Sequence, residues 1–254
     1  ALMKKSPPVR QQAIEYLQFL KEQGITHVPS SGKRPVRPSR SRSKPTPAPA
    51  PAAASRPAPD PRPTLVVPAP LQPIVDEIAA CRLCPLAKTR QHTVPGQGPL
   101  RPDILFVGEG PGADEDAQGI AFIGRAGQLL SRMITAMGYT RDEVFIGNIV
   151  KCRPPGNRVP TPSEMAGCIP YLKRQIAIIR PKLIVCLGAT AARGLVQETL
   201  PIGKARGQWR EFEGIPVMLT FHPAYLLRDP SKKGPCWDDL KAVLARLGKK
   251  PPKA

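Results

Sequence analysis

From residue 71 onward, strand-like runs alternate with stretches whose apolar residues recur at helical spacing, and this alternation limits the fold more than any other feature. The strand-like runs are 103–108, 143–150, 182–187, 207–213 and 215–221. The helix-like stretches are 71–80, 124–137, 161–179, 189–196 and 236–247. Strands that alternate with helices predict an α/β fold, here a three-layer sandwich whose central sheet is mainly parallel.

Residues 1–70 differ from this pattern. Residues 9–23 have the apolar spacing of a short amphipathic helix, and we assign residues 1–28 to a segment of unknown role. Residues 29–70 contain 13 Pro together with Ser, Ala and Arg, so we expect a disordered, extended, basic linker there. The sequence therefore predicts one folded domain over residues 71–254.

The charge of the chain points to a polyanionic partner. Its formal charge is +19, and residues 76–254 alone hold 26 Lys and Arg against 16 Asp and Glu. The folded part is therefore basic in its own right, and nucleic acid is the first candidate partner.

The sequence shows no membrane or export signal. No apolar run approaches the roughly 18 residues of a membrane span, and the N-terminal lysines precede no apolar signal-peptide segment. We therefore expect a cytoplasmic location, where cysteines more often bind metals than form disulfides.

Four cysteines have the spacing of a ligand set. Cys81 and Cys84 form a C-x2-C pair, and Cys152 and Cys168 follow in a distant segment. Four thiolates can hold a tetrahedral zinc ion or a [4Fe–4S] cluster, and the single tight pair favours the cluster over a zinc ribbon. The alternative is four unrelated thiols, because free cysteine is commonly buried. Cys186, inside an apolar run, fits that description.

Polar and glycine-rich segments follow three of the predicted strands. These segments are Gly108–Gly112, Asn148 and His222–Arg228. Because ligands of parallel sheets bind at the carboxyl ends of strands, we expect the three segments to share one rim. Two of them also have ordinary explanations: a Gly/Pro turn for Gly108–Gly112, and a structural histidine with a helix start packed on the core for His222–Arg228.

In combination, these motifs resemble the family 4 uracil-DNA glycosylases, iron–sulfur enzymes that excise uracil from DNA. The resemblance covers about residues 75–247. It rests on five segments in order, which are 81–86, 108–116, 122–130, 148–158 and 222–228. It implies a uracil-DNA glycosylase-like fold and one [4Fe–4S] cluster held by Cys81, Cys84, Cys152 and Cys168.

The resemblance also implies roles for the strand-end residues. The residues that it places in the uracil pocket are Gly108, Gly110, Phe122, Asn148 and His222. Catalysis would fall to Glu109, Asn148 and His222, with Glu109, Glu115 and Asn148 all open as the group that positions water. Apart from the resemblance, Tyr225, Leu226 and Leu227 form an apolar loop tip that ends in Arg228, and such a tip can act as a DNA wedge. We also expect Arg158 to face the DNA backbone.

The implied reaction extracts uracil from the DNA helix and hydrolyses its N-glycosidic bond, which leaves an abasic site. The expected partner is single- or double-stranded DNA containing uracil, and the expected state is a monomer. Two other classes stay open. One is a non-catalytic nucleic-acid-binding module with a structural metal, and the other is a nucleotide-binding enzyme that uses Gly108–Gly112.

Overall fold

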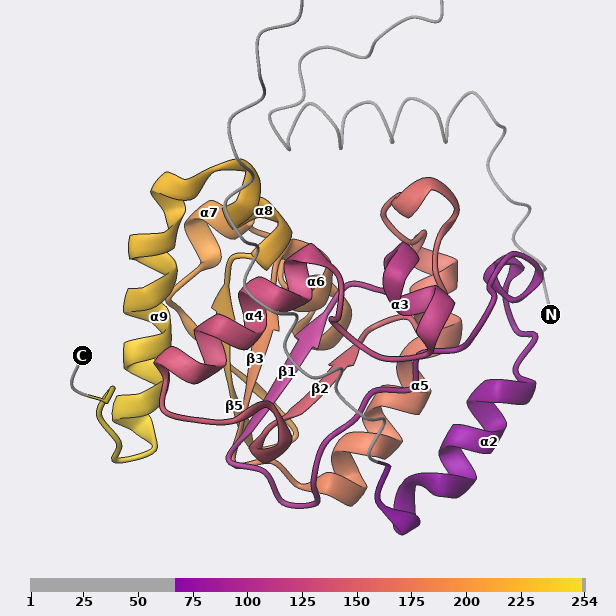
Figure 1. The fold of residues 1–254 in the computed structure, drawn as a ribbon, viewed down its shortest axis with the longest axis horizontal. Helices are drawn as coiled ribbons and strands as arrows, with labels where there is room; N and C mark the ends of the chain where they lie inside the picture. The colour runs from indigo at the N-terminus through magenta and orange to yellow at the C-terminus, as the bar shows by residue number, and fades with distance from the viewer. Residues whose placement is uncertain (1–66, 253–254) are drawn as a thin grey trace, which may run out of the picture. The chain divides into compact units, whose positions relative to one another are not determined.

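The structure, a computed structural model, describes residues 67–252. The helix predicted at 9–23 and nearly all of the linker predicted at 29–70 lie outside the described residues. The five strands are β1 (Ile104–Gly108), β2 (Phe145–Asn148), β3 (Leu183–Leu187), β4 (Trp209–Phe212) and β5 (Ile215–Thr220). They form one sheet in the order β2-β1-β3-β5-β4, and only β4, at an edge, is antiparallel (Figure 1).

Helices cover both faces of this sheet. They are α2 (Gln72–Ala80), α3 (Ala113–Gln118), α4 (Arg125–Ala136), α5 (Pro162–Ile179), α6 (Ala189–Val196), α7 (Ile202–Ala205), α8 (Pro223–Arg228) and α9 (Lys233–Arg246). Within β1, Leu105 and Val107 pack on α2, α5 and α6, whereas Ile104 and Phe106 pack on α4 and α9. Because successive strand residues face opposite ways, the sheet is buried on both sides. The predicted three-layer sandwich is confirmed.

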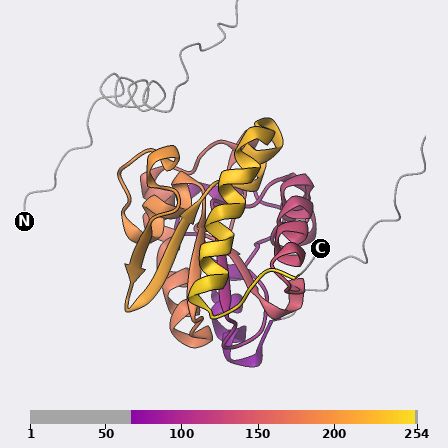
Figure 2. The same ribbon diagram turned by 90° about the vertical axis from the view of Figure 1, so that its left-hand side faces the viewer.

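The predicted element boundaries differ from the observed ones in a few places. The run 143–150 forms a strand only over β2, and the runs 207–213 and 215–221 form the antiparallel hairpin β4–β5, which lies beside α9 in Figure 2. The helix predicted at 236–247 begins at Lys233, and the short helices α3 and α7 are additions. Within residues 67–252, no helix is both long and apolar enough to cross a membrane.

Two local interactions fix the ends of the elements that matter for the site. Helix α5 begins with a capping box, in which Thr161 Oγ1 accepts a hydrogen bond from the Glu164 N–H and the Glu164 carboxylate accepts one from the Thr161 N–H. At the end of β5, the buried carboxylate of Asp239 in α9 accepts a 2.6 Å hydrogen bond from Thr220 Oγ1 and is paired with Arg206. The chain segment that follows β5 is therefore held against α9.

The strand register brings the carboxyl ends of the strands together. Gly108 is the partner of Asn148, and Leu187 is the partner of Thr220. The pairing of β1 with β2 continues one step further, because the Val150 N–H donates to the Glu109 carbonyl. The three segments that the sequence analysis placed on one rim therefore do lie at the same edge of the sheet.

Candidate active site

Gly108 lies where the aromatic and amide side chains of the site meet. A Cβ atom added at Gly108 would overlap the Phe122 ring and would lie 2.5 Å from Asn148 Oδ1. Only glycine allows the two side chains to approach the end of β1 this closely. A Cβ added at Gly110 would lie 2.6 Å from Val150 Cγ2, so the loop after β1 also packs tightly on the loop after β2.

Asn148 carries a buried hydrogen-bond acceptor that has no partner. Its side chain is 1 % exposed, and its Oδ1 atom accepts no hydrogen bond from the residues that the structure describes. Leaving a buried polar atom unpaired costs about 1–3 kcal/mol, so native proteins rarely do so without a reason. A ligand that brings an N–H or O–H donor would satisfy this atom.

Phe122 is held in an unusual backbone conformation. Its φ angle is 53°, in the left-handed region, and its side chain is 5 % exposed. Glu115 secures the following turn, because its Oε1 accepts hydrogen bonds from the N–H groups of Ile123 at 2.9 Å and Gly124 at 2.8 Å. Arg141 donates to the carbonyl of Ala121 on the preceding side. The backbone on both sides of Phe122 is therefore held in place, and the ring itself is buried.

The sequence analysis left Glu115 as a candidate for the group that positions water, but its contacts indicate a different role. Its second oxygen, Oε2, accepts a 3.0 Å hydrogen bond from the Gly112 N–H at the start of α3. Both oxygens of the carboxylate are thus engaged by backbone amides. Glu115 ties the loop after β1 to the loop that carries Phe122, which is a positioning function.

His222 begins α8 directly after β5 and faces Phe122. The two ring centroids are 5.7 Å apart. His222 Nδ1 accepts a 3.1 Å hydrogen bond from the Ala224 N–H, so the proton of the neutral ring is on Nε2. Burial, together with the positive charge of Arg228, lowers the pKa of His222 from 6.5 to about 4. At neutral pH the residue is therefore an uncharged Nε2–H donor.

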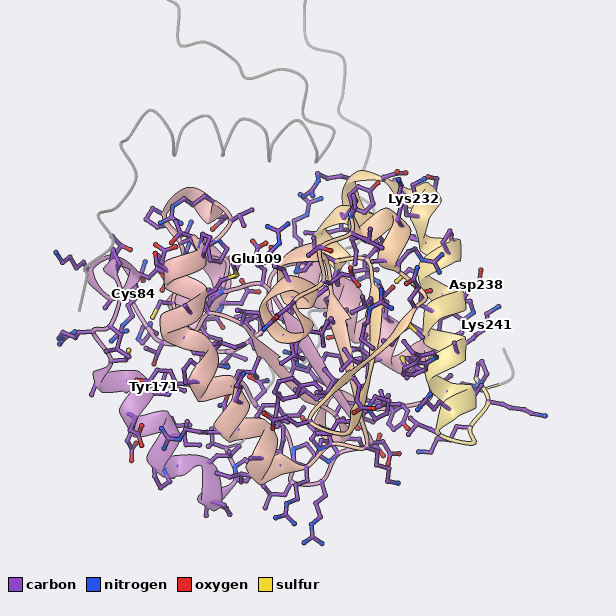
Figure 3. All side chains as sticks on the ribbon, turned by 180° about the vertical axis from the view of Figure 1, so that it is seen from behind. Cys84, Glu109, Tyr171, Lys232, Asp238 and Lys241 are labelled. Carbon is purple, nitrogen blue, oxygen red and sulfur yellow. The ribbon has the colours of Figure 1, made fainter. Side chains whose placement is uncertain are left out.

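Glu109 lies on the same rim, at the place labelled in Figure 3. Burial raises the pKa of its carboxyl group, and a hydrogen bond from Thr190 Oγ1 opposes that shift. Thr190 was absent from the sequence prediction. A polar residue shortly after a predicted strand could have indicated it, because Thr190 lies three residues beyond the end of β3.

Two predicted DNA-contact residues are placed differently from expectation. Leu226, predicted on a wedge, is 1 % exposed and packs on Leu129 and Phe221, so it belongs to the core. Arg158, predicted to face phosphates, makes a two-pronged ion pair with Glu164, at 2.8 and 2.7 Å, that fixes the loop to α5. The other wedge residues are Tyr225 and Leu227, both partly exposed, and Arg228, which is exposed.

The four spaced cysteines line one cavity. Cys81 and Cys84 come from the end of α2 and the loop after it, Cys152 from the loop after β2, and Cys168 from α5. Figure 3 labels Cys84 and Tyr171, which both line this cavity. The other two cysteines lie elsewhere, Cys186 inside β3 and Cys236 in α9 beside Thr220.

Basic groups surround these sulfurs. Arg90 Nη1 donates a 3.1 Å hydrogen bond to Cys152 Sγ, and the Lys151 backbone N–H donates a 3.2 Å bond to Cys168 Sγ. Burial raises the pKa of the Cys168 thiol to about 11 in the absence of a bound cation. Within residues 67–252, no group of three or more His, Cys, Asp or Glu side chains is placed to hold a metal ion.

Comparison with known proteins identifies the family. The model of the uracil-DNA glycosylase superfamily matches residues 95–241. A type-4 uracil-DNA glycosylase of Archaeoglobus fulgidus is 43 % identical over 190 residues, which is 72 % of this chain and 96 % of the relative. The chain belongs to the type-4 uracil-DNA glycosylase family. The type-4 enzyme of Thermotoga maritima is 48 % identical over 166 residues, covering 64 % of this chain and 86 % of the relative.

A more distant relative lies in a sister family. A type-5 uracil-DNA glycosylase of Pyrobaculum aerophilum is 29 % identical over 153 residues, which is 52 % of this chain and 66 % of the relative. The family resemblance expected from the five sequence segments is therefore confirmed at the level of the type-4 family.

The state of His222 in this type-4 family member can be measured directly. The carbon-bound ring proton of His222, assigned by its loss in His222→Gln, should titrate near pH 4, because burial opposes charging of the ring. The measurement is a proton NMR titration. A midpoint near the ordinary 6.5 would show that the ring is solvated and is not the neutral donor described above.

Proposed function

We propose that this chain removes uracil from DNA by binding the extruded base between Phe122, Asn148 and His222 and hydrolysing its N-glycosidic bond. Free uracil and an abasic site are the products, as in base excision repair. The observation that carries the proposal is the buried, unpaired Oδ1 of Asn148 beside the fixed Phe122 ring. A ring that stacks on Phe122 and presents an N–H group would satisfy that atom.

Base selection follows from the amide of Asn148. Its Oδ1 accepts from uracil N3–H while its NH2 group donates to uracil O4. Cytosine has the reverse pattern, with an acceptor at N3 and donors at N4, so it would leave the buried amide mispaired. A buried mispaired polar group is costly, and cytosine is therefore rejected.

Departure of the base is assisted by a neutral donor. Negative charge develops on uracil O2 as the glycosidic bond breaks, and His222 Nε2–H is the donor that we assign to that oxygen. A neutral donor fixed in a water-poor site stabilises developing charge without the cost of reorganising solvent. The hydrogen bond from Ala224 maintains the required tautomer.

The attacking water is assigned to Glu109. Its carboxylate accepts a hydrogen bond from Thr190, which orients one oxygen and leaves the other for water. Of the three candidates named in the sequence analysis, Glu115 is engaged by backbone amides and Asn148 is assigned to the base. The burial that raises the pKa of Glu109 also makes it a better base once ionised.

The proposed substrate is uracil-containing DNA, single- or double-stranded, bound by a monomer in the cytoplasm. The basic charge of the folded part suits a phosphate backbone. A non-catalytic binding module would have no need of a buried unpaired amide, and a nucleotide-binding enzyme would not need a neutral histidine opposite a fixed aromatic ring.

Substitution of the base-contacting residues tests this function. Asn148→Ala and His222→Ala should each lower single-turnover excision from a uracil-containing oligonucleotide roughly 100- to 1000-fold, because each removes a group that acts on the departing base. Binding to abasic DNA should stay near the wild-type level, since that ligand has no base to contact. The exposed His92, changed to Ala, is the control. Near wild-type excision by His222→Ala would refute the site assignment.

We further propose that Cys81, Cys84, Cys152 and Cys168 hold one [4Fe–4S] cluster. The donor set fits, because all four sulfurs line a single cavity. The single tight C-x2-C pair, with the other two cysteines in a distant segment, favours the cluster over a zinc ribbon. Four cysteine thiolates are the usual ligands of such a cluster, and these four residues would hold it. Its contribution when bound is structural, since it joins α2 and α5 to the loop after β2.

Iron analysis of cysteine variants tests the ligand set. The purified protein should contain iron and acid-labile sulfide, and Cys84→Ala or Cys168→Ala should lose both and melt at a lower temperature, because cluster binding contributes to folding. Cys186→Ala, which removes a buried thiol outside the cavity, should keep its iron. Stoichiometric zinc without iron after anaerobic purification would contradict the assignment.

A further inference from the structure

Lys151 connects the cysteine cavity to the base-recognising residue. Its side chain is 1 % exposed and lines the cavity that the four cysteines share. Its Nζ donates a 3.0 Å hydrogen bond to the backbone carbonyl of Asn148, and its backbone N–H donates to Cys168 Sγ. One residue thus touches both the proposed cluster site and the strand end that carries the uracil-binding amide.

The charge of Lys151 has no carboxylate partner. Among residues 67–252, no Asp or Glu side chain forms a hydrogen bond or an ion pair with it, and its Nζ donates to a neutral carbonyl. A buried ammonium without a compensating charge is strongly unfavourable. Arg90, which contacts Cys152, is the second cation facing the cavity.

A bound cluster would supply the missing compensation. Four thiolates around an oxidised [4Fe–4S] core keep a net negative charge, and two cations, Lys151 and Arg90, line the cavity. With that compensation the ammonium of Lys151 is stable inside the protein, where it can reach the Asn148 carbonyl. Without that negative charge the ammonium has one neutral acceptor, and its burial in the protein interior is unfavourable.

We propose that Lys151 is a positioning residue that couples the cysteine site to the uracil pocket. Compensated by the cluster, its ammonium fixes the Asn148 carbonyl and with it the direction of the buried Asn148 amide. The turn between them has little freedom to compensate, because the N–H groups of Ile149 and Val150 are committed to the carbonyls of Gly108 and Glu109. This inference rests on the proposed function, since it takes Asn148 as the group that binds uracil.

A double-mutant cycle with Asn148 tests the coupling. Lys151→Met, which keeps an unbranched side chain without the charge, should lower single-turnover excision roughly 10- to 100-fold in the wild-type background, the range for a lost hydrogen bond from a charged group. In the Asn148→Ala background the same change should matter less than about twofold, because the side-chain amide that Lys151 positions is already gone. Should Lys151→Met fail to fold, Lys151→Gln replaces it in the same cycle.

Reduction potential gives a second, independent measurement. Removing a positive charge beside the cluster disfavours its reduction, so Lys151→Met and the matched Arg90→Met should both have lower potentials than the wild type. Only Lys151→Met should show the dependence on Asn148, because Arg90 contacts Cys152 rather than the strand end. Both variants are first checked for iron content and melting temperature.

The outcomes separate the inference from the function on which it rests. Equal losses from Lys151→Met in the two backgrounds, or an unchanged potential, would overturn the coupling alone. Wild-type excision by Asn148→Ala would overturn the proposed role of Asn148, and absence of iron from the wild-type protein would overturn the cluster assignment. Either result would overturn this inference as well. A loss confined to the wild-type background, with a lowered potential, supports the coupling.

Discussion

The parallel pairing of β1 with β2, which sets Gly108 directly beside Asn148, is the constraint on which the site depends. It carries the buried amide to the carboxyl edge of the sheet, and glycine at position 108 leaves room for the Phe122 ring next to it. The loops that leave these two strands remain paired for one further step. A shift of this register by one residue would turn Asn148 to the other face of the sheet and abolish the pocket.

Burial then determines what the polar groups of the pocket can do. It keeps His222 neutral, raises the pKa of Glu109, and makes the unpaired oxygen of Asn148 costly until a ligand reaches it. These groups are useful only when they are immobile, and backbone hydrogen bonds to Glu115 supply much of that rigidity. The same low-dielectric interior makes the ammonium of Lys151 depend on negative charge at the cysteine cavity.

Much of this architecture could be predicted from the sequence, because it depends on local patterns. Apolar runs and helical spacing predicted the sheet and its covering helices, and polar residues after strands predicted the shared rim. What depends on the exact direction of one side chain could not be predicted. Leu226 faces the core, Arg158 pairs with Glu164, and Glu115 accepts hydrogen bonds from backbone amides. These contacts depend on how separate segments pack or on the shape of a turn, and neither can be read from a local sequence pattern.

The central claim is that a buried amide selects uracil by its N3–H and O4 pattern. The most direct test compares single-turnover excision from two oligonucleotides that differ only in carrying uracil or cytosine at one position, with abasic sites detected by alkaline cleavage. The account predicts excision of uracil and no detectable excision of cytosine at saturating protein. Comparable rates for the two bases, or an intact uracil strand, would contradict it.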